Sequence, residues 1–172
     1  MRSVALAAVS AVFAGVVFQE ASAGTPRLKP VQFAPAVGWL LRLGTVHSCP
    51  GVFASRCSQV TSTASTTRYR DCVDCFPHRT AAAMRANDIA VRITLALEHP
   101  MRVGHTCAWP PRVTSRRVLA PFEGLPRRIG VYLCQTPVGT REVSVFIVFG
   151  RAIPTTRQLN LVNAELRRAR LG

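Results

Sequence analysis

Two cysteines three positions apart, Cys72 and Cys75, lie in the part of the chain that is richest in reactive side chains. This segment, residues 68–80, reads RYRDCVDCFPHRT and also holds two aspartates, a histidine and three arginines. A Cys-x-x-Cys motif can form a redox centre, half of a zinc site or a structural disulfide. Which of these applies depends on the compartment and on the elements that position the cysteines.

A redox-active pair needs a thiol with a lowered pKa, which the N-terminus of a helix can provide. The residues after Pro77 predict a short helix over 78–87, which would allow that geometry. Asp71 and Asp74 would instead raise the pKa of a neighbouring thiol. These aspartates favour a disulfide, and thiol–disulfide exchange through Cys72 and Cys75 is the alternative.

A zinc site would draw its ligands from the cysteines and a nearby histidine. The spacing of Cys72 and Cys75 suits half of a structural site. The spacing of Cys49 and Cys57 is too long for the other half, and His78 would be the remaining donor. We therefore expect no metal site and no cofactor.

The first residues of the chain indicate export. A positive start is followed by an uncharged apolar run over residues 4–18 and by Ala-Ser-Ala at 21–23, the small-x-small pattern that signal peptidase recognises. The run is about fifteen residues, whereas a membrane span needs roughly twenty. We expect a signal peptide over residues 1–23, cleavage near Ala23, a secreted or extracytoplasmic protein, and no transmembrane span after cleavage. An uncleaved N-terminal membrane anchor is the alternative.

The cysteine count agrees with an oxidising compartment. An even number of cysteines in an exported chain indicates disulfides. We expect Cys107 to pair with Cys134 and the other four to pair among themselves. Two arrangements of those four stay open: Cys72 bonds to Cys75, or each of them reaches back to an earlier cysteine. The six candidates are Cys49, Cys57, Cys72, Cys75, Cys107 and Cys134.

Cys107 gives a second enzymatic alternative. Thr106-Cys107 resembles the end of the Thr-Leu-x-Thr-Cys segment of sortases, which are exported β-barrel transpeptidases. His47 lies upstream and Arg112 or Arg116 downstream, in the order that this family uses. The resemblance implies a cysteine nucleophile at Cys107.

Other catalytic motifs are absent from the sequence. It has no Gly-x-Ser-x-Gly, no His-Glu-x-x-His and no phosphate-binding glycine loop. We therefore expect a non-enzymatic binding or envelope structural domain. A cysteine-dependent envelope enzyme or thiol–disulfide redox protein, using Cys72 and Cys75 or Cys107, is the alternative.

The net charge of the chain is +14, with 22 basic residues against eight acidic ones. Lys29 is the only lysine. A solvated basic surface is the simplest interpretation; a more specific one is attraction to an anionic cell-wall polymer or lipid surface. Nucleic acid is not an expected partner, because no recognition motif is present. The candidate anion-binding residues form three adjacent pairs: Arg116 and Arg117, Arg127 and Arg128, Arg167 and Arg168.

Alternating hydrophobic residues predict a single β-rich domain over residues 36–172. Residues 88–98 and 141–149 alternate most strictly, and the second should be a central strand covered on both sides. A strand over 129–135 precedes it, and the connection over 136–140, with proline and glycine, predicts a β-hairpin.

Other strands are predicted from weaker patterns. Residues 39–47 and 60–70 are strand candidates, and serine and threonine in the second favour an exposed or edge strand. Residues 113–119 are a further candidate. Residues 24–35 should lead into the domain.

The chain should end in an amphipathic helix over residues 155–171. Thr155 is a suitable N-cap, and Gln158 completes a capping box. Leu159, Val162 and Leu166 then fall on one side of the helix. The predicted class is α+β, a mostly antiparallel sheet with this helix packed on one face. A β-sandwich with a peripheral helix is the alternative.

Overall fold

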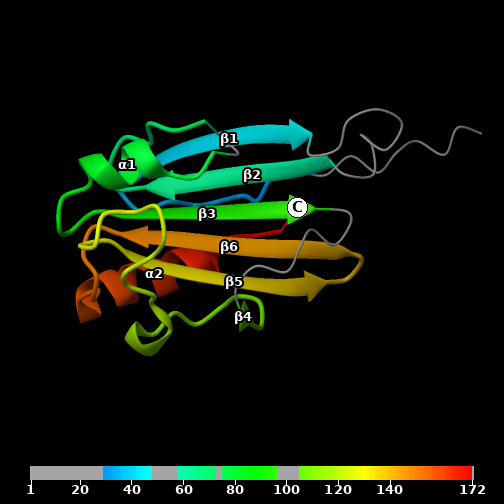
Figure 1. The fold of residues 1–172 in the computed structure, drawn as a ribbon. Helices are drawn as coiled ribbons and strands as arrows, with labels where there is room; N and C mark the ends of the chain where they lie inside the picture. Colours follow the sequence, from blue (N-terminus) through cyan, green and yellow to red (C-terminus); the bar gives the residue numbers. More distant parts are fainter. Residues whose placement is uncertain (1–28, 48–57, 73–74, 97–104, 172) are drawn as a thin grey trace, which may run out of the picture.

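A computed structural model describes residues 29–47, 58–72, 75–96 and 105–171 (Figure 1). In this part of the chain, six strands form one sheet in the order β1-β2-β3-β6-β5-β4. Neighbouring strands are antiparallel except β4 and β5, which are parallel. The strands are β1 (Leu40–His47), β2 (Ser58–Ser65), β3 (Ile89–Ala96), β4 (His105–Thr106), β5 (Gly130–Val138) and β6 (Arg141–Phe149).

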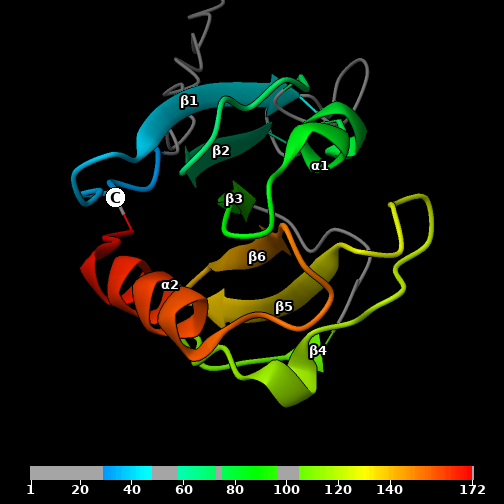
Figure 2. The same ribbon diagram turned by 90° about the vertical axis from the view of Figure 1, so that its left-hand side faces the viewer.

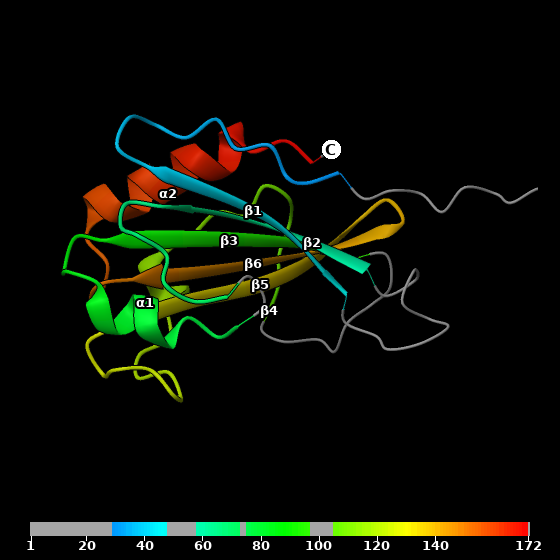
Figure 3. The ribbon, with the colours of Figure 1, turned by 90° about the horizontal axis from the view of Figure 1, so that it is seen from above.

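The helices are short apart from the last one. Those in the described residues are α1 (His78–Ala83), the 3-10 helix η2 (Ser115–Arg117) and α2 (Thr156–Arg168). Figures 2 and 3 show α2 on one face of the sheet and α1 on the other. The predicted α+β class is confirmed, and the described strands form a single sheet instead of a sandwich. No helix among the described residues is long and apolar enough to cross a membrane.

The main hydrophobic core lies between the sheet and α2. The strict alternation of β3 and β6 places one set of their side chains on this face, and burying a side chain of this size contributes roughly 2 kcal/mol. Val162 and Leu166 of α2 are fully buried against them. The buried strand residues of this face are Ile89, Val91, Ile93, Leu95, Val143, Val145, Ile147 and Phe149.

The capping box of α2 is present as the sequence predicts. The Thr155 hydroxyl accepts a hydrogen bond from the Gln158 backbone N–H at 3.2 Å, and the Gln158 side chain accepts one from the Thr155 N–H at 3.0 Å. The helix ends at Arg168, earlier than predicted. The reason is that Arg170 exchanges two backbone hydrogen bonds of 2.9 Å with Gln32. The segment expected to lead into the domain is thereby held against it, with Val31 and Phe33 in the core.

The β5–β6 hairpin has a tighter turn than predicted. Both strands continue through the expected connection, and only Gly139 and Thr140 form the loop. Gly139 has φ +62°, which suits the first position of a type II′ turn. Pro137 fits inside β5 because β4 pairs only with Cys134 and Gln135, so no described ladder bond needs its missing N–H.

The strand predicted over residues 60–70 is present as β2, but the prediction that it is exposed or at an edge is wrong. The strand ends at Ser65, and β2 lies between β1 and β3, which makes β1 the edge strand. Two buried hydroxyls of β2 have partners inside the protein: Ser62 donates to the Val31 carbonyl at 3.0 Å, and the hydroxyls of Thr61 and Thr94 are 3.1 Å apart. Internal partners of this kind allow a serine- and threonine-rich strand to be buried.

Two further predictions need correction. Residues 113–119 do not form a strand, because residues 115–117 form η2 and the backbone of Val113 bonds to the Asn163 side chain of α2 at 2.8 and 3.0 Å. The helix predicted over 78–87 ends at Ala83. The expected signal peptide, Cys49, Cys57 and Asp74 lie outside the described residues.

Candidate functional site

The connection between β2 and α1 crosses the face of the sheet opposite α2. It is described at residues 66–72 and 75–77, and we call it the β2–α1 connection. The sheet below it presents a row of side chains that are neighbours in the strand register. From β1 to β6 this row is Arg42, Thr63, Arg92 and Phe146.

Two arginines of this row hold the β2–α1 connection onto the sheet. The Arg42 guanidinium donates to the Asp71 carbonyl at 2.7 Å, and the Arg92 guanidinium donates to the Cys75 carbonyl at 2.8 Å. Arg92 also lies over the Phe146 ring, 5.0 Å from its centroid. One of these carbonyls directly precedes Cys72 and the other belongs to Cys75. Hydrogen bonds from the sheet therefore hold both ends of the Cys-x-x-Cys motif.

Cys72 and Cys75 are bonded to each other, with their Cα atoms 5.0 Å apart. The alternative in which each reaches back to an earlier cysteine is therefore wrong. Because the two sulfurs form a disulfide, they offer no thiolates to a zinc ion. Both residues are exposed.

Cys107 forms a disulfide with Cys134, which is fully buried in the main core. This bond joins the segment after β4 to β5. Disulfide bonding in the domain is thus confirmed. Since the Cys107 sulfur is bonded, it is not a free nucleophile of the kind that the sortase resemblance implies.

Asp71 does not act on the cysteines but caps α1. Pro77 at the N-cap position has no side-chain acceptor, and the Asp71 carboxylate replaces it. It accepts hydrogen bonds from the backbone N–H groups of Arg79 at 3.0 Å and Thr80 at 2.8 Å, and from the Thr80 hydroxyl. Burial raises the pKa of Asp71, but these hydrogen bonds outweigh burial and hold the pKa below its usual value.

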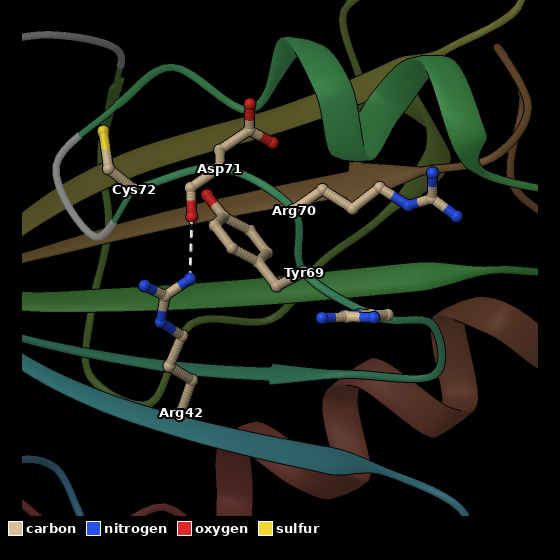
Figure 4. Close-up of a pocket in the computed structure, with 6 residues that line it drawn as sticks. Arg42, Tyr69, Arg70, Asp71 and Cys72 are labelled. Atoms are coloured by element: carbon tan, nitrogen blue, oxygen red, sulfur yellow. Dashed lines mark hydrogen bonds between the residues drawn. The ribbon is translucent and has the colours of Figure 1, made fainter.

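A cavity of about 580 Å³ opens beside the disulfide. Figure 4 shows Arg42 reaching up from β1 to the Asp71 carbonyl, with the Tyr69 ring between Arg42 and Arg70. The Asp71 carboxylate points towards α1, where its hydrogen bonds lie. The residues that line the cavity are Arg42, Arg68, Tyr69, Arg70, Asp71 and Cys72.

The electrostatics of this cavity are strongly positive. Arg68 and Arg70 are exposed, and their guanidinium groups have no hydrogen-bond or ion-pair partner among the described residues. The Tyr69 hydroxyl is buried without a hydrogen-bond partner in the same part of the chain. Burial raises the pKa of Tyr69, and the positive charge of Arg92 opposes that rise only in part. Tyr69 is therefore a neutral wall of the cavity at physiological pH.

The arginine pairs nominated from the sequence lie on different elements. Arg116 and Arg117 are exposed on η2. The Arg128 guanidinium donates to the carbonyls of Ala82 and Met84, both at 2.9 Å, and of Ala81 at 3.3 Å, at the C-terminal end of α1. Its neighbour Arg127 is exposed.

The third pair lies at the end of α2, where Arg167 and Arg168 line a second cavity of about 470 Å³ with Arg170. Arg168 forms an ion pair of 3.3 Å with the buried Glu165. This cavity adjoins the C-terminus of a helix, whose partial negative charge favours cations and disfavours an anionic ligand. The structure does not bring the three sequence-nominated pairs together. Sequence reasoning did not nominate Arg42, Arg68 or Arg70.

His105 and Tyr132 form a separate polar pair beside the Cys107–Cys134 disulfide. Their rings meet edge to face, 5.1 Å apart between centroids. Burial, and then the positive charge of Arg117, lowers the pKa of His105. His105 Nε2 and the Tyr132 hydroxyl are buried without partners among the described residues. The cysteine beside them, Cys107, is bonded to Cys134 and is therefore not a free thiol.

No protein-family model, curated protein or solved structure matches this chain. The geometry of the Arg42–Arg68–Arg70 cavity is therefore the basis for inferring a function.

Proposed function

We propose that this chain is an extracytoplasmic, non-enzymatic binding domain that is stabilised by disulfides and binds an anionic partner. The cavity beside the Cys72–Cys75 disulfide carries the proposal. It presents Arg68 and Arg70, which have no partner among the described residues, next to Arg42, which uses one of its N–H groups on the Asp71 carbonyl. A guanidinium has five N–H donors, so most of the donor capacity in the cavity is available to a ligand.

The chemistry of these side chains selects the kind of partner. The planar guanidinium fork matches the geometry of phosphate and carboxylate groups, to which it can donate two hydrogen bonds. The Asp71 carboxylate, which lines the same cavity, accepts hydrogen bonds from Arg79 and Thr80 of α1 and does not pair with these arginines. The net charge of +14 also attracts polyanions from a distance.

The same groups support binding in preference to catalysis. Cys72 is bonded to Cys75, Tyr69 stays protonated at neutral pH, and the Asp71 carboxylate caps a helix. The described residues that line the cavity thus supply arginines and hydrogen-bond donors, and none of them is an activated nucleophile or a general base.

Titration calorimetry with inorganic polyphosphate, a soluble polyanion, tests this proposal. The oxidised, secreted protein should bind polyphosphate at low ionic strength, and the affinity should fall at physiological salt, because exposed charges are screened beyond about 8 Å there. Absence of binding at low salt, or an affinity that salt does not change, would contradict the proposal.

Thiol–disulfide exchange is a second candidate function, favoured by the exposure of both Cys72 and Cys75. A redox role requires a thiol in the reduced protein with a pKa well below its ordinary value of about 8.5. Iodoacetamide alkylation of the reduced protein as a function of pH measures that pKa. A value near 8.5 or above would eliminate the redox function, and a value of about 7 or below would favour it over simple stabilisation.

A further inference from the structure

The large exposed hydrophobic side chains of the described residues are concentrated at one place. Four of them lie in residues 37–43, on β1 and the turn that precedes it. Two others, Leu119 and Ile153, are isolated on other elements. The four are Val37, Leu40, Leu41 and Leu43.

This apolar group occupies the free edge of the sheet. Among the described strands, β1 pairs only with β2, and Figure 2 shows β1 far from α2. Successive side chains of a strand point to opposite faces, so Leu40 and Arg42 share the cavity face while Leu41 and Leu43 point to the other. Leu40 and Leu43 are each 53% exposed. Leu40 is thus exposed on the face of the arginines, and Leu41 and Leu43 are exposed on the opposite face of the same edge strand.

We propose that the β1 edge and the adjoining cavity together form a surface that binds an anionic lipid bilayer. Leu40, Leu41 and Leu43 enter the outer part of the bilayer, and Arg68 and Arg70 contact the lipid phosphates. This inference rests on the proposed function, because the arginines of the cavity supply the attraction to the anionic groups.

The presence of both arginines and exposed leucines favours a lipid partner over a purely polar polyanion. An arginine close to an anionic membrane raises the affinity about fivefold. An exposed leucine that leaves water raises it by up to about tenfold. A soluble polyanion would gain affinity only from the arginines, and the exposed leucines would remain in water.

The strand edge limits the depth of insertion. Unpaired N–H and C=O groups of an edge strand cannot enter the hydrocarbon region without a large cost. Binding is therefore confined to the hydrated boundary between head groups and acyl chains, where amphipathic surfaces reach roughly 5–10 Å.

A second copy of the chain is the main competing occupant of this edge, since free strand edges can pair with each other. Two copies, each with a net charge of +14 and with Arg42 on the same edge strand, repel one another. The same charge is complementary to an anionic bilayer. Charge therefore favours the lipid surface over self-association.

Vesicle sedimentation with paired variants tests the inference. The secreted protein, with its N-terminus determined by mass spectrometry, should bind vesicles containing about 30% phosphatidylglycerol and bind pure phosphatidylcholine at least tenfold more weakly. The Leu40→Ser/Leu43→Ser variant should lose at least tenfold in affinity for anionic vesicles and keep its affinity for polyphosphate. The control variant Leu119→Ser/Ile153→Ser, with side chains that are 50% and 76% exposed outside β1, should bind both like the parent protein.

The outcomes separate this inference from the proposed function. Polyphosphate binding without vesicle binding, or equal loss of vesicle binding in both variants, overturns the lipid inference alone. Absence of binding to polyphosphate and to vesicles overturns both proposals. Sedimentation velocity could instead show that the parent protein is a dimer and that the Leu40→Ser/Leu43→Ser variant is a monomer. That result would assign the edge to a second copy and also overturn the lipid inference.

Discussion

Asp71 and Thr80 are joined by two hydrogen bonds to one oxygen: the backbone N–H of Thr80 donates to Asp71 Oδ2 at 2.8 Å, and the Thr80 hydroxyl donates to the same atom. The Thr80 hydroxyl in turn accepts a hydrogen bond from the Arg70 backbone N–H at 2.9 Å. The start of α1 is thereby tied to the backbone that carries the arginines of the cavity. The positions of Arg68 and Arg70 depend on this contact.

We expect Asp71→Asn to destabilise the protein by about 1–2 kcal/mol. The amide keeps one acceptor oxygen and places its NH2 group against the donors of α1. Urea unfolding should show a lower midpoint with an unchanged slope. Glu123→Gln, in an exposed loop, is the control and should change stability by less than about 0.5 kcal/mol. Equal stability of Asp71→Asn and Glu123→Gln would show that Asp71 does not cap α1.

The contribution of Asp71 should depend on pH in one direction. Burial raises its pKa, but the hydrogen bonds from Thr80 and Arg79 outweigh burial, so the folded-state pKa is below the ordinary value of 3.8. A carboxyl of this kind stabilises the fold fully above its unfolded pKa and loses that effect as the pH falls through its folded pKa. The stability difference between the parent protein and Asp71→Asn should be constant near neutral pH and shrink below 3.8. A difference that grows on acidification would contradict this assignment.

Arg128 and its neighbour Arg127 should differ in their effect on stability. Arg128→Gln removes the donors to the carbonyls of Ala81, Ala82 and Met84 at the end of α1, and we expect a loss of about 1 kcal/mol. Arg127→Gln makes the same change of charge at an exposed side chain and should be nearly neutral. Thermal unfolding of the two variants makes the comparison, and equal melting temperatures would show that the contacts of Arg128 contribute nothing.

The two described disulfides should differ in both accessibility and contribution to stability. Cys72–Cys75 is exposed and spans three positions, whereas Cys107–Cys134 spans 27 and includes the fully buried Cys134. Removing Cys107–Cys134 with alanines should cost about 3–4 kcal/mol, and removing Cys72–Cys75 with serines about 2 kcal/mol or less. Mild reduction followed by alkylation and peptide mapping should label Cys72 and Cys75 before Cys107. The reverse order of labelling would contradict the described burial.

Much of the sheet and the last helix could be predicted from local sequence. Strict alternation identified β3 and β6, and the capping box at Thr155 identified α2, because these signals depend only on residues near one another. The burial of β2 could not be predicted, since serine and threonine usually face solvent. Here they bond to the Val31 carbonyl and to Thr94, which are distant in sequence.

The candidate site was harder to predict for the same reason. Adjacent pairs such as Arg127–Arg128 are conspicuous in the sequence, yet Arg128 bonds to the backbone at the end of α1. The arginines of the cavity include Arg42, from a strand 26 positions before Arg68, and only the register of β1 with β2 and β3 brings it under the β2–α1 connection. Arg68 and Arg70 lie in the segment richest in reactive side chains, but the Cys-x-x-Cys spacing there indicates redox or metal chemistry and not anion binding.

We propose that the cavity beside the Cys72–Cys75 disulfide is the anion-binding site. A comparison of two variants with equal net charge tests this assignment most directly. Arg68→Gln/Arg70→Gln removes the two arginines of the cavity that have no partner among the described residues, and Arg116→Gln/Arg117→Gln removes a sequence-nominated pair on η2. We predict that polyphosphate affinity at low salt falls about 30-fold in the first variant, at about 1 kcal/mol per arginine, and by less than about threefold in the second. Equal losses in the two variants would show that binding follows the net charge of the chain and would contradict the assignment of the site.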